Sequence, residues 1–201
     1  MLGGEVGATL TRKLRDGSRL NLQTVAFRHR VQDAIVREPT GDGRFRRMNR
    51  HAIRSTGLEL LADWSVSSGL SLTADLLLQR VREQQPTAGD RPAEHQPGLR
   101  GRVGAGTPFA FGARILTDLR YIGRQYCVHP ELATEVALNS GVESDIALEK
   151  SWALGGLGVG AGLLSSLRGT IGIDNLADAT VHDQCGLPRP GRTIRFAIQM
   201  R

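Results

Sequence analysis

Apolar and polar residues alternate with a period of two along most of the chain. In the last segment, Ile194, Phe196 and Ile198 share one face of an extended chain, while Arg195 and Gln199 share the other. A period of two is the repeat of a β-strand, whose successive side chains point to opposite faces. The same alternation predicts nine strands, at 5–14, 20–31, 52–66, 70–79, 98–106, 111–121, 142–149, 167–174 and 193–201. We therefore expect an all-β fold.

The lengths of the strands and of their connections indicate the kind of β-fold. Most of the predicted strands have about ten residues, the length of a tilted strand that crosses a bilayer. The connections alternate between short links at 15–17, 67–69 and 107–108 and long polar links near 37–45, 82–97 and 124–140. Transmembrane barrels alternate short turns with long loops in this way. We expect an antiparallel, up-and-down transmembrane β-barrel segment of about nine strands over residues 1–201, open rather than closed.

One link does not follow this alternation. Residues 152–165 form a long connection where a short turn is expected, and we interpret it as a wide Gly-rich turn. Its glycines at 155–162 lack both the G-x-G-x-x-G spacing and a following Lys-Ser/Thr pair, so they do not predict a nucleotide site. The chain also lacks the G-x-S-x-G and H-E-x-x-H signatures. We therefore expect no catalytic residues and no enzyme activity.

Composition and charge narrow the function classes. The chain carries a formal charge of +6, and its pI is near 10.3, a balance often found in nucleic-acid-binding proteins. Its arginines are spread singly instead of clustering with stacking aromatics, so we expect no nucleic-acid partner. No apolar run is long enough for a transmembrane helix. In a membrane the chain must then form a barrel, because only helices and closed barrels satisfy their backbone polar groups in lipid.

Charged and aromatic side chains mark the two faces of the predicted barrel. Six arginines oppose the apolar series and are expected to face the lumen: Arg100, Arg102, Arg114, Arg120, Arg168 and Arg195. They either attract anionic ligands or pair across strands with acids, and we favour pairing. Their candidate partners are Asp75, Asp118, Glu143, Asp145 and Glu149. The aromatics that suit the membrane interfaces are Trp64, Tyr121, Tyr126 and Trp152.

Four short motifs suggest a family. They are Gly57 to Trp64 (G-x-E-x-x-x-x-W), Tyr121 to Tyr126 (Y-x-G-x-x-Y), Asp174 to Asp178 (with N-L-x-D) and Pro188 to Arg195 (P-x-P-G-R-x-x-x). In their order and their spacing from the C-terminus, they resemble the C-terminal barrel of TonB-dependent outer-membrane receptors. The resemblance covers nearly the whole chain. It implies a cell outer-membrane location in a Gram-negative bacterium, with outer-membrane lipid as a partner.

The resemblance also implies a function. Such receptors have 22 strands around a plug, and they import iron-siderophore complexes, cobalamin or similar nutrients with energy delivered by TonB. This chain departs from that pattern, because it shows no plug, only nine strands and no phenylalanine after Arg201, and because Met1 to Glu5 lacks the pattern of a signal peptide. We expect part of a receptor, inactive without its missing N-terminal strands and plug: a fragment, a remnant or a split receptor. The alternative is a structural or ligand-binding barrel completed by self-association or by another chain.

The two cysteines are compatible with three kinds of chemistry. In the barrel interpretation, Cys127 and Cys185 both lie in loops on the outer side, so a disulfide would join two extracellular loops. The oxidising export route favours this bond. The sequence is also compatible with two free thiols, or with a metal site that adds His129 and His182 to the two cysteines. We expect the disulfide, no resident metal and no cofactor.

Overall fold

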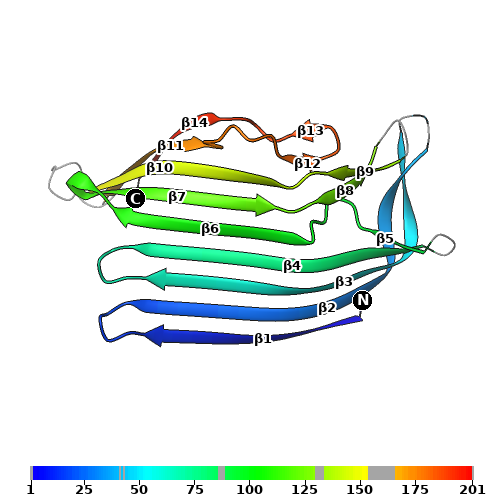
Figure 1. Cartoon of the computed structure of the whole chain (residues 1–201), viewed down its shortest axis with the longest axis horizontal. Helices are drawn as coiled ribbons and strands as arrows, with labels where there is room; N and C mark the ends of the chain where they lie inside the picture. The colour runs from blue at the N-terminus through cyan, green and yellow to red at the C-terminus, as the bar shows by residue number, and fades with distance from the viewer. Residues whose placement is uncertain are drawn as a thin grey trace.

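A single antiparallel sheet runs through the computed structural model of the chain (Figure 1). The structure describes residues 2–40, 42, 44–85, 89–129, 134–153 and 166–200. Nine strands follow one another across the sheet in chain order: β1 (Leu2–Lys13), β2 (Arg19–Pro39), β3 (Phe45–Ser65), β4 (Ser71–Gln85), β6 (Leu99–Pro108), β7 (Ala113–Ile122), β10 (Gly141–Ala153), β11 (Ser166–Asp174) and β14 (Thr193–Met200). The predicted up-and-down order of nine strands is confirmed.

Five short strands lie in the long links, where the sequence suggested only polar loops. β5 (Gly89–Pro92) pairs with the end of β4. The other four form two hairpins: β8 (Gln125–Val128) with β9 (Glu135–Leu138), and β12 (His182–Gln184) with β13 (Leu187–Pro188). These strands are two to four residues long, too short for an alternating pattern to be visible in the sequence.

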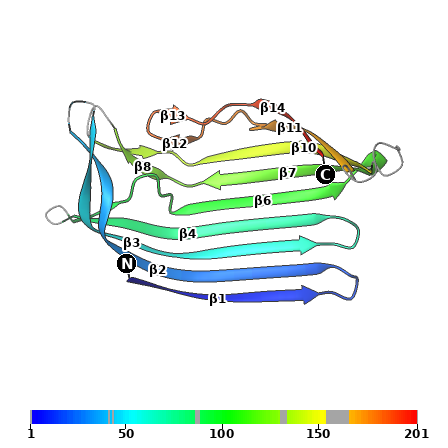
Figure 2. The same cartoon turned by 180° about the vertical axis from the view of Figure 1, so that it is seen from behind.

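β2 and β3 are longer than their alternation predicts. Each has 21 residues, and their pairing continues into the link that the sequence placed at 37–45. Backbone hydrogen bonds pair strands whatever side chains they carry, so the alternation of apolar and polar residues fades before the pairing ends. Asp33, with φ of 52°, interrupts β2. Beyond it the ribbon bends away from the sheet, at the end where β8 and β9 lie (Figures 1 and 2).

The short connections gather at the opposite end of the sheet (Figure 2). Two of them are built alike: the amide of Leu14 donates to Ser18 O, and the amide of Val66 donates to Leu70 O, both at 2.8 Å. Each contains a glycine with positive φ, Gly17 at 86° and Gly69 at 91°, a backbone shape that glycine adopts without strain. The third link holds the 3₁₀ turn η1 (Ala110–Gly112). The short-turn and long-loop ends are therefore separated as predicted, although residues 154–165 of the fourth link lie outside the described part of the chain.

Strand register divides the sheet into an apolar face and a polar face. The apolar face carries aligned side chains such as Leu60 and Leu76, and the polar face carries aligned side chains such as Asp75 and Arg102. Large apolar side chains stay exposed on the first face, with Leu60 at 39% and Phe196 at 73%. A soluble protein buries such a surface, so this exposure indicates a face that contacts something other than water.

The sheet is open. Within the described residues, β1 and β14 each pair with one neighbour, so each leaves a free edge. The described part of the chain holds no helix that is long and apolar enough to span a bilayer.

Candidate functional site

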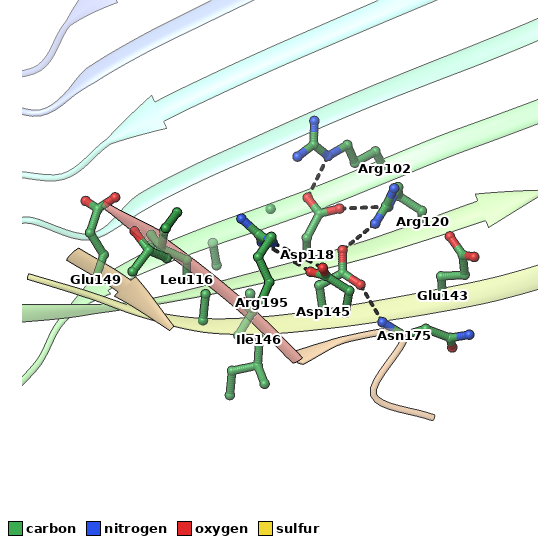
Figure 3. Close-up of a pocket in the computed structure, with 18 of the residues that line it drawn as sticks. Arg102, Leu116, Asp118, Arg120, Glu143, Asp145, Ile146, Glu149, Asn175 and Arg195 are labelled. Atoms are coloured by element: carbon green, nitrogen blue, oxygen red, sulfur yellow. Dashed lines mark hydrogen bonds and ion pairs between the residues drawn. The ribbon is translucent and has the colours of Figure 1, made fainter. Parts of the chain in front are cut away.

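The polar face of the sheet encloses a hollow of about 890 Å³ between β4 and β14 (Figure 3). Its walls carry arginine and carboxylate side chains from β6, β7, β10, β11 and β14, and Asn175 at the start of the last loop. A hollow lined by both signs of charge suits a polar or water-filled interior rather than an apolar ligand. The apolar face of the same strands carries few charges, so the hollow is the chemically distinct side of the molecule.

A continuous series of paired charged groups crosses this hollow. Arg102 Nε lies 2.6 Å from Asp118 Oδ2, and Asp118 Oδ1 lies 3.2 Å from Arg120 Nε. Arg120 also pairs with Asp145 through its Nη2. Asp145 then accepts a hydrogen bond from the amide of Asn175 at 2.8 Å. Three strands and one loop are thereby joined by charge-assisted contacts (Figure 3).

The strand register explains why this series of charged groups forms. Arg102 lies directly opposite Arg120, and Asp118 lies directly opposite Asp145, so like charges face each other across neighbouring strands. Arg102 therefore reaches diagonally to Asp118, a distance that long side chains span. Arg120 lies directly opposite Glu143, but Glu143 pairs with Arg189, and Arg120 reaches diagonally to Asp145. The side chains of Asp118 and Asp145 are each 15% exposed, so both carboxylates depend on these partners for compensation of their lost hydration.

The remaining predicted arginines also lie on the polar face. Arg195 donates two hydrogen bonds to Asp174, both at 3.1 Å. Arg168 lies 3.9 Å from Glu149, and Arg114 donates to Ser71 Oγ at 3.0 Å. Arg100 lies on the same face, opposite Leu77 and Ile122. The structure thus holds four of the six arginines in ion pairs, and the acidic partner of Arg195 is one that the sequence did not suggest.

The N-L-x-D motif builds the loop that closes one end of the hollow. Asn175 is 4% exposed and has φ of 51°, a left-handed conformation that asparagine tolerates better than most residues. Its side chain donates to Ala179 O at 2.9 Å and accepts from the amide of Ala179 at 2.8 Å. Asp178 accepts a hydrogen bond from the amide of Arg192 at 2.8 Å. The motif therefore sets the path of the chain between β11 and β14.

A second contact fastens the same loop to the sheet. Glu143 of β10 has a side chain that is 5% exposed, and its Oε2 lies 2.7 Å from Arg189 Nη1. Arg189 follows β13, and its amide donates to Val181 O at 2.7 Å. Val181 is itself almost fully buried and packs against Gly141, where an added Cβ would lie 2.6 Å from its side chain. Gly141 is therefore the residue that allows the loop to approach β10.

The predicted disulfide is confirmed. Cys127 of β8 and Cys185, between β12 and β13, are bonded to each other, with their Cα atoms 5.9 Å apart. Gln125 adds a hydrogen bond from its Nε2 to His182 O at 3.1 Å, so the two hairpins are joined at two points. Because the sulfurs bond to each other, neither is free to ligate a metal together with His129 and His182. No group of three or more His, Cys, Asp or Glu side chains in the described ranges is arranged to hold a metal ion.

Three of the four predicted interfacial aromatics lie in the main sheet, toward its two ends. Trp64 and Trp152 lie on the apolar face near the short-turn end, and Lys150 Nζ lies 5.5 Å above the Trp152 ring. Tyr121 lies on the apolar face near the long-loop end, whereas Tyr126 belongs to β8, outside the main sheet. A role at membrane interfaces stays a prediction for these four residues.

Known proteins share this geometry. No protein-family profile and no curated protein matches the chain. Solved structures do match over 98% of its length: the ferric-catecholate import receptor Fiu of E. coli K12 (TM-score 0.67, 14% identity), the FrpB iron transporter of Neisseria meningitidis (0.67, 18%) and the outer-membrane ferripyoverdine receptor of Pseudomonas aeruginosa (0.66, 13%). The resemblance to TonB-dependent receptor barrels is confirmed at the level of fold.

The match concerns only part of each of those proteins. The chain covers 27% of the Fiu chain, 29% of the FrpB chain and 26% of the ferripyoverdine receptor chain. The chain has the fold of a segment of such barrels.

Five arginines on the apolar face were missed by the sequence reasoning. They continue the apolar series of β2, β3 and β4 toward the long-loop end: Arg28, Arg30, Arg54, Arg80 and Arg82. The signal was present, because Leu20, Leu22, Thr24 and Ala26 keep the same parity as Arg28 and Arg30. The predicted strands at 20–31 and 52–66 already contained Arg28, Arg30 and Arg54, but only arginines that oppose the apolar series were singled out.

Proposed function

We propose that this chain is the C-terminal part of an outer-membrane TonB-dependent receptor that imports a nutrient such as a metal–siderophore complex. The observation that carries the proposal is the open nine-strand sheet, which matches receptor barrels over 98% of the chain. The exposed apolar face supports contact with outer-membrane lipid, and the charged hollow supports a polar lumen. In this proposal the chain is not an enzyme and holds no resident cofactor.

The free edges support a requirement for further strands. β1 spans Leu2–Lys13, and its outer edge would expose a row of unpaired backbone groups to lipid. Each unsatisfied group costs several kcal/mol in a hydrocarbon environment, so the sum exceeds the roughly 5–15 kcal/mol that stabilises an ordinary domain. The sheet alone is therefore expected to be inactive, and additional strands, a plug and TonB are its proposed partners.

Photo-crosslinking at both edges tests this proposal. A photoreactive residue at Thr9 in β1 and another at Ala197 in β14 probe the two free edges, and the same residue at Val103, on the apolar face of β6, provides a mid-sheet control. In native outer membranes, we expect protein adducts at both edges and only lipid adducts at Val103.

The mass of the adducts separates a receptor from a self-associated barrel. Adducts to a polypeptide that carries further receptor strands and a plug support the proposal. Adducts of twice the mass of this chain, or adducts to a polypeptide without a plug, would support a structural barrel instead. A purified chain that ran as a heat-modifiable, protease-resistant monomer in detergent would overturn the requirement for other strands. Recovery of the chain outside the membrane fraction would overturn the outer-membrane assignment itself.

A further inference from the structure

The arginines on the apolar face of β2, β3 and β4 form two rows across the strands. In the first row, Arg30 lies directly opposite Arg54, and Arg54 lies directly opposite Arg82. The second row lies two residues closer to the short turns along each strand, and there Arg28 and Arg80 flank Thr56. We call these five residues the outer arginine patch.

The outer arginine patch lies at one boundary of the apolar belt. On β2 the same face runs from Leu20 through Leu22 to Ala26 before it reaches Arg28. Arg30 lies ten residues beyond Leu20, about 33 Å along the strand and about 25 Å along the membrane normal for a tilt of about 40°. The apolar band of transmembrane barrels is about 25 Å tall, so the row of Arg30, Arg54 and Arg82 falls where lipid headgroups begin. The row of Arg28 and Arg80 lies about 5 Å below it, within reach of the headgroups for long side chains.

The patch has no internal charge compensation. Four of its arginines are exposed, and none of the five forms an ion pair within the described residues. Asp90 of β5 is an acid on this face, and it lies opposite Gln84 at the margin of the patch. Like charges directly opposite each other on neighbouring strands destabilise a sheet, so the row of Arg30, Arg54 and Arg82 calls for an external anion.

The geometry points to a phosphorylated lipid headgroup of the outer leaflet as that anion. This assignment rests on the proposed function, because it requires the apolar face to lie in an outer membrane. Guanidinium groups bind phosphate through paired hydrogen bonds, and adjacent strands about 4.8 Å apart let neighbouring arginines share one phosphate. The acyl chains of the same lipid would cover Leu58 and Leu78, which lie one step below Arg28 and Arg80. Nucleic acid fits less well, because the patch adjoins an apolar belt and includes no aromatic side chain.

Binding of lipid A to the full chain in neutral detergent tests the inference. The probes are lipid A with two phosphates, lipid A with one, and fully dephosphorylated lipid A, and native mass spectrometry measures retention. One triple variant removes the upper row: Arg30→Gln, Arg54→Gln and Arg82→Gln. The control variant removes the same charge at the short-turn end of the sheet: Arg12→Gln, Arg15→Gln and Arg19→Gln. Circular dichroism verifies that both variants keep their strand content.

We expect retention to follow phosphate number and to fall roughly tenfold or more in the upper-row variant but not in the control. Equal retention by the two variants, or equal retention of the dephosphorylated lipid, would overturn the inference. Release of the lipid by millimolar inorganic phosphate, or its displacement by a DNA oligonucleotide, would overturn it too, by showing a general anion site instead. Absence of protein adducts at Thr9 and Ala197 in native outer membranes counts against the proposed function alone, since lipid binding in detergent is measured independently.

Discussion

Arginine performs opposite tasks in the two regions of the sheet. In the C-terminal region, from β6 to β14, arginines such as Arg120 lie on the polar face and pair with carboxylates such as Asp145. In the N-terminal region, from β2 to β4, arginines such as Arg54 lie on the apolar face without an acidic partner in the described chain. Paired arginines hold strands and loops together, whereas unpaired arginines at a belt boundary can bind an external anion. Strand parity and carboxylate position therefore say more about the role of an arginine than net charge does.

The loops differ between the two regions as well. In the C-terminal region, the β8–β9 and β12–β13 hairpins are joined by the disulfide and by Gln125, and Glu143 fastens the last loop to β10. In the N-terminal region, the β2–β3 ribbon extends beyond the sheet without a disulfide. The C-terminal loops are thus expected to be the more rigid of the two sets.

Loss of the disulfide is expected to have the largest effect. Replacing Cys127 and Cys185 by serine releases a closure of 58 residues, which the chain-entropy model values at about 4 kcal/mol. Urea unfolding in detergent measures the loss, and limited proteolysis locates it. New cleavage is expected in the β12–β13 hairpin, while cleavage of the β2–β3 ribbon stays unchanged. Dithiothreitol should lower the stability of the wild type to that of the variant and leave the stability of the variant unchanged. Equal stability of the two proteins without dithiothreitol would contradict the prediction.

The Asp145→Asn substitution is expected to have the next largest effect. It removes the charge that pairs with Arg120 and weakens acceptance from the amide of Asn175, so the free energy of unfolding should fall by about 2 kcal/mol. Asp75→Asn is the matched control, because Asp75 also lies on the polar face, opposite Arg102, but forms no ion pair in the described part of the chain. The control is expected to change stability by less than about 0.5 kcal/mol. Similar losses of unfolding free energy in both variants would mean that the series of charged groups makes no specific contribution to stability.

The Arg54→Gln substitution should act in the opposite direction. Arg54 lies between Arg30 and Arg82, so its removal in phosphate-free detergent relieves repulsion and should raise the free energy of unfolding by about 0.5 kcal/mol. Arg102→Gln, which breaks the contact with Asp118, should lower it by a similar or larger amount. Urea titrations of both variants under the same conditions measure the sign of each change in the free energy of unfolding. Loss of stability in both variants would remove the distinction between the two regions.

The main strands were predictable because their alternation is a direct consequence of having one apolar and one polar face. The Cys127–Cys185 bond was predictable from the same strand order, since it placed both loops on one side. The ends of β2 and β3 were not predictable, because backbone pairing continues beyond the hydrophobic pattern. The hydrogen bond from the amide of Asn175 to Asp145 was not predictable either, since it depends on a loop that folds back through a residue in the left-handed conformation.

The smallest effect is expected in the short turn at Asp16, which joins β1 to β2 and depends on a carboxylate as the C-terminal region does. Hydrogen bonds first from the amide and then from the hydroxyl of Ser18 hold the pKa of Asp16 below its ordinary value. A carboxyl with a lowered folded pKa stabilises the protein at pH values above its unfolded pKa, near 3.9, and this contribution is lost as pH falls through the folded pKa. The Asp16→Asn variant should therefore be less stable than the wild type at pH 7, with the difference shrinking below pH of about 4. The turn at Val66–Leu70 has the same backbone hydrogen bonds without an acid, so Ser68→Asn there should leave the pH dependence unchanged. Parallel unfolding curves of wild type and Asp16→Asn at every pH would show that this carboxylate contributes nothing to the fold.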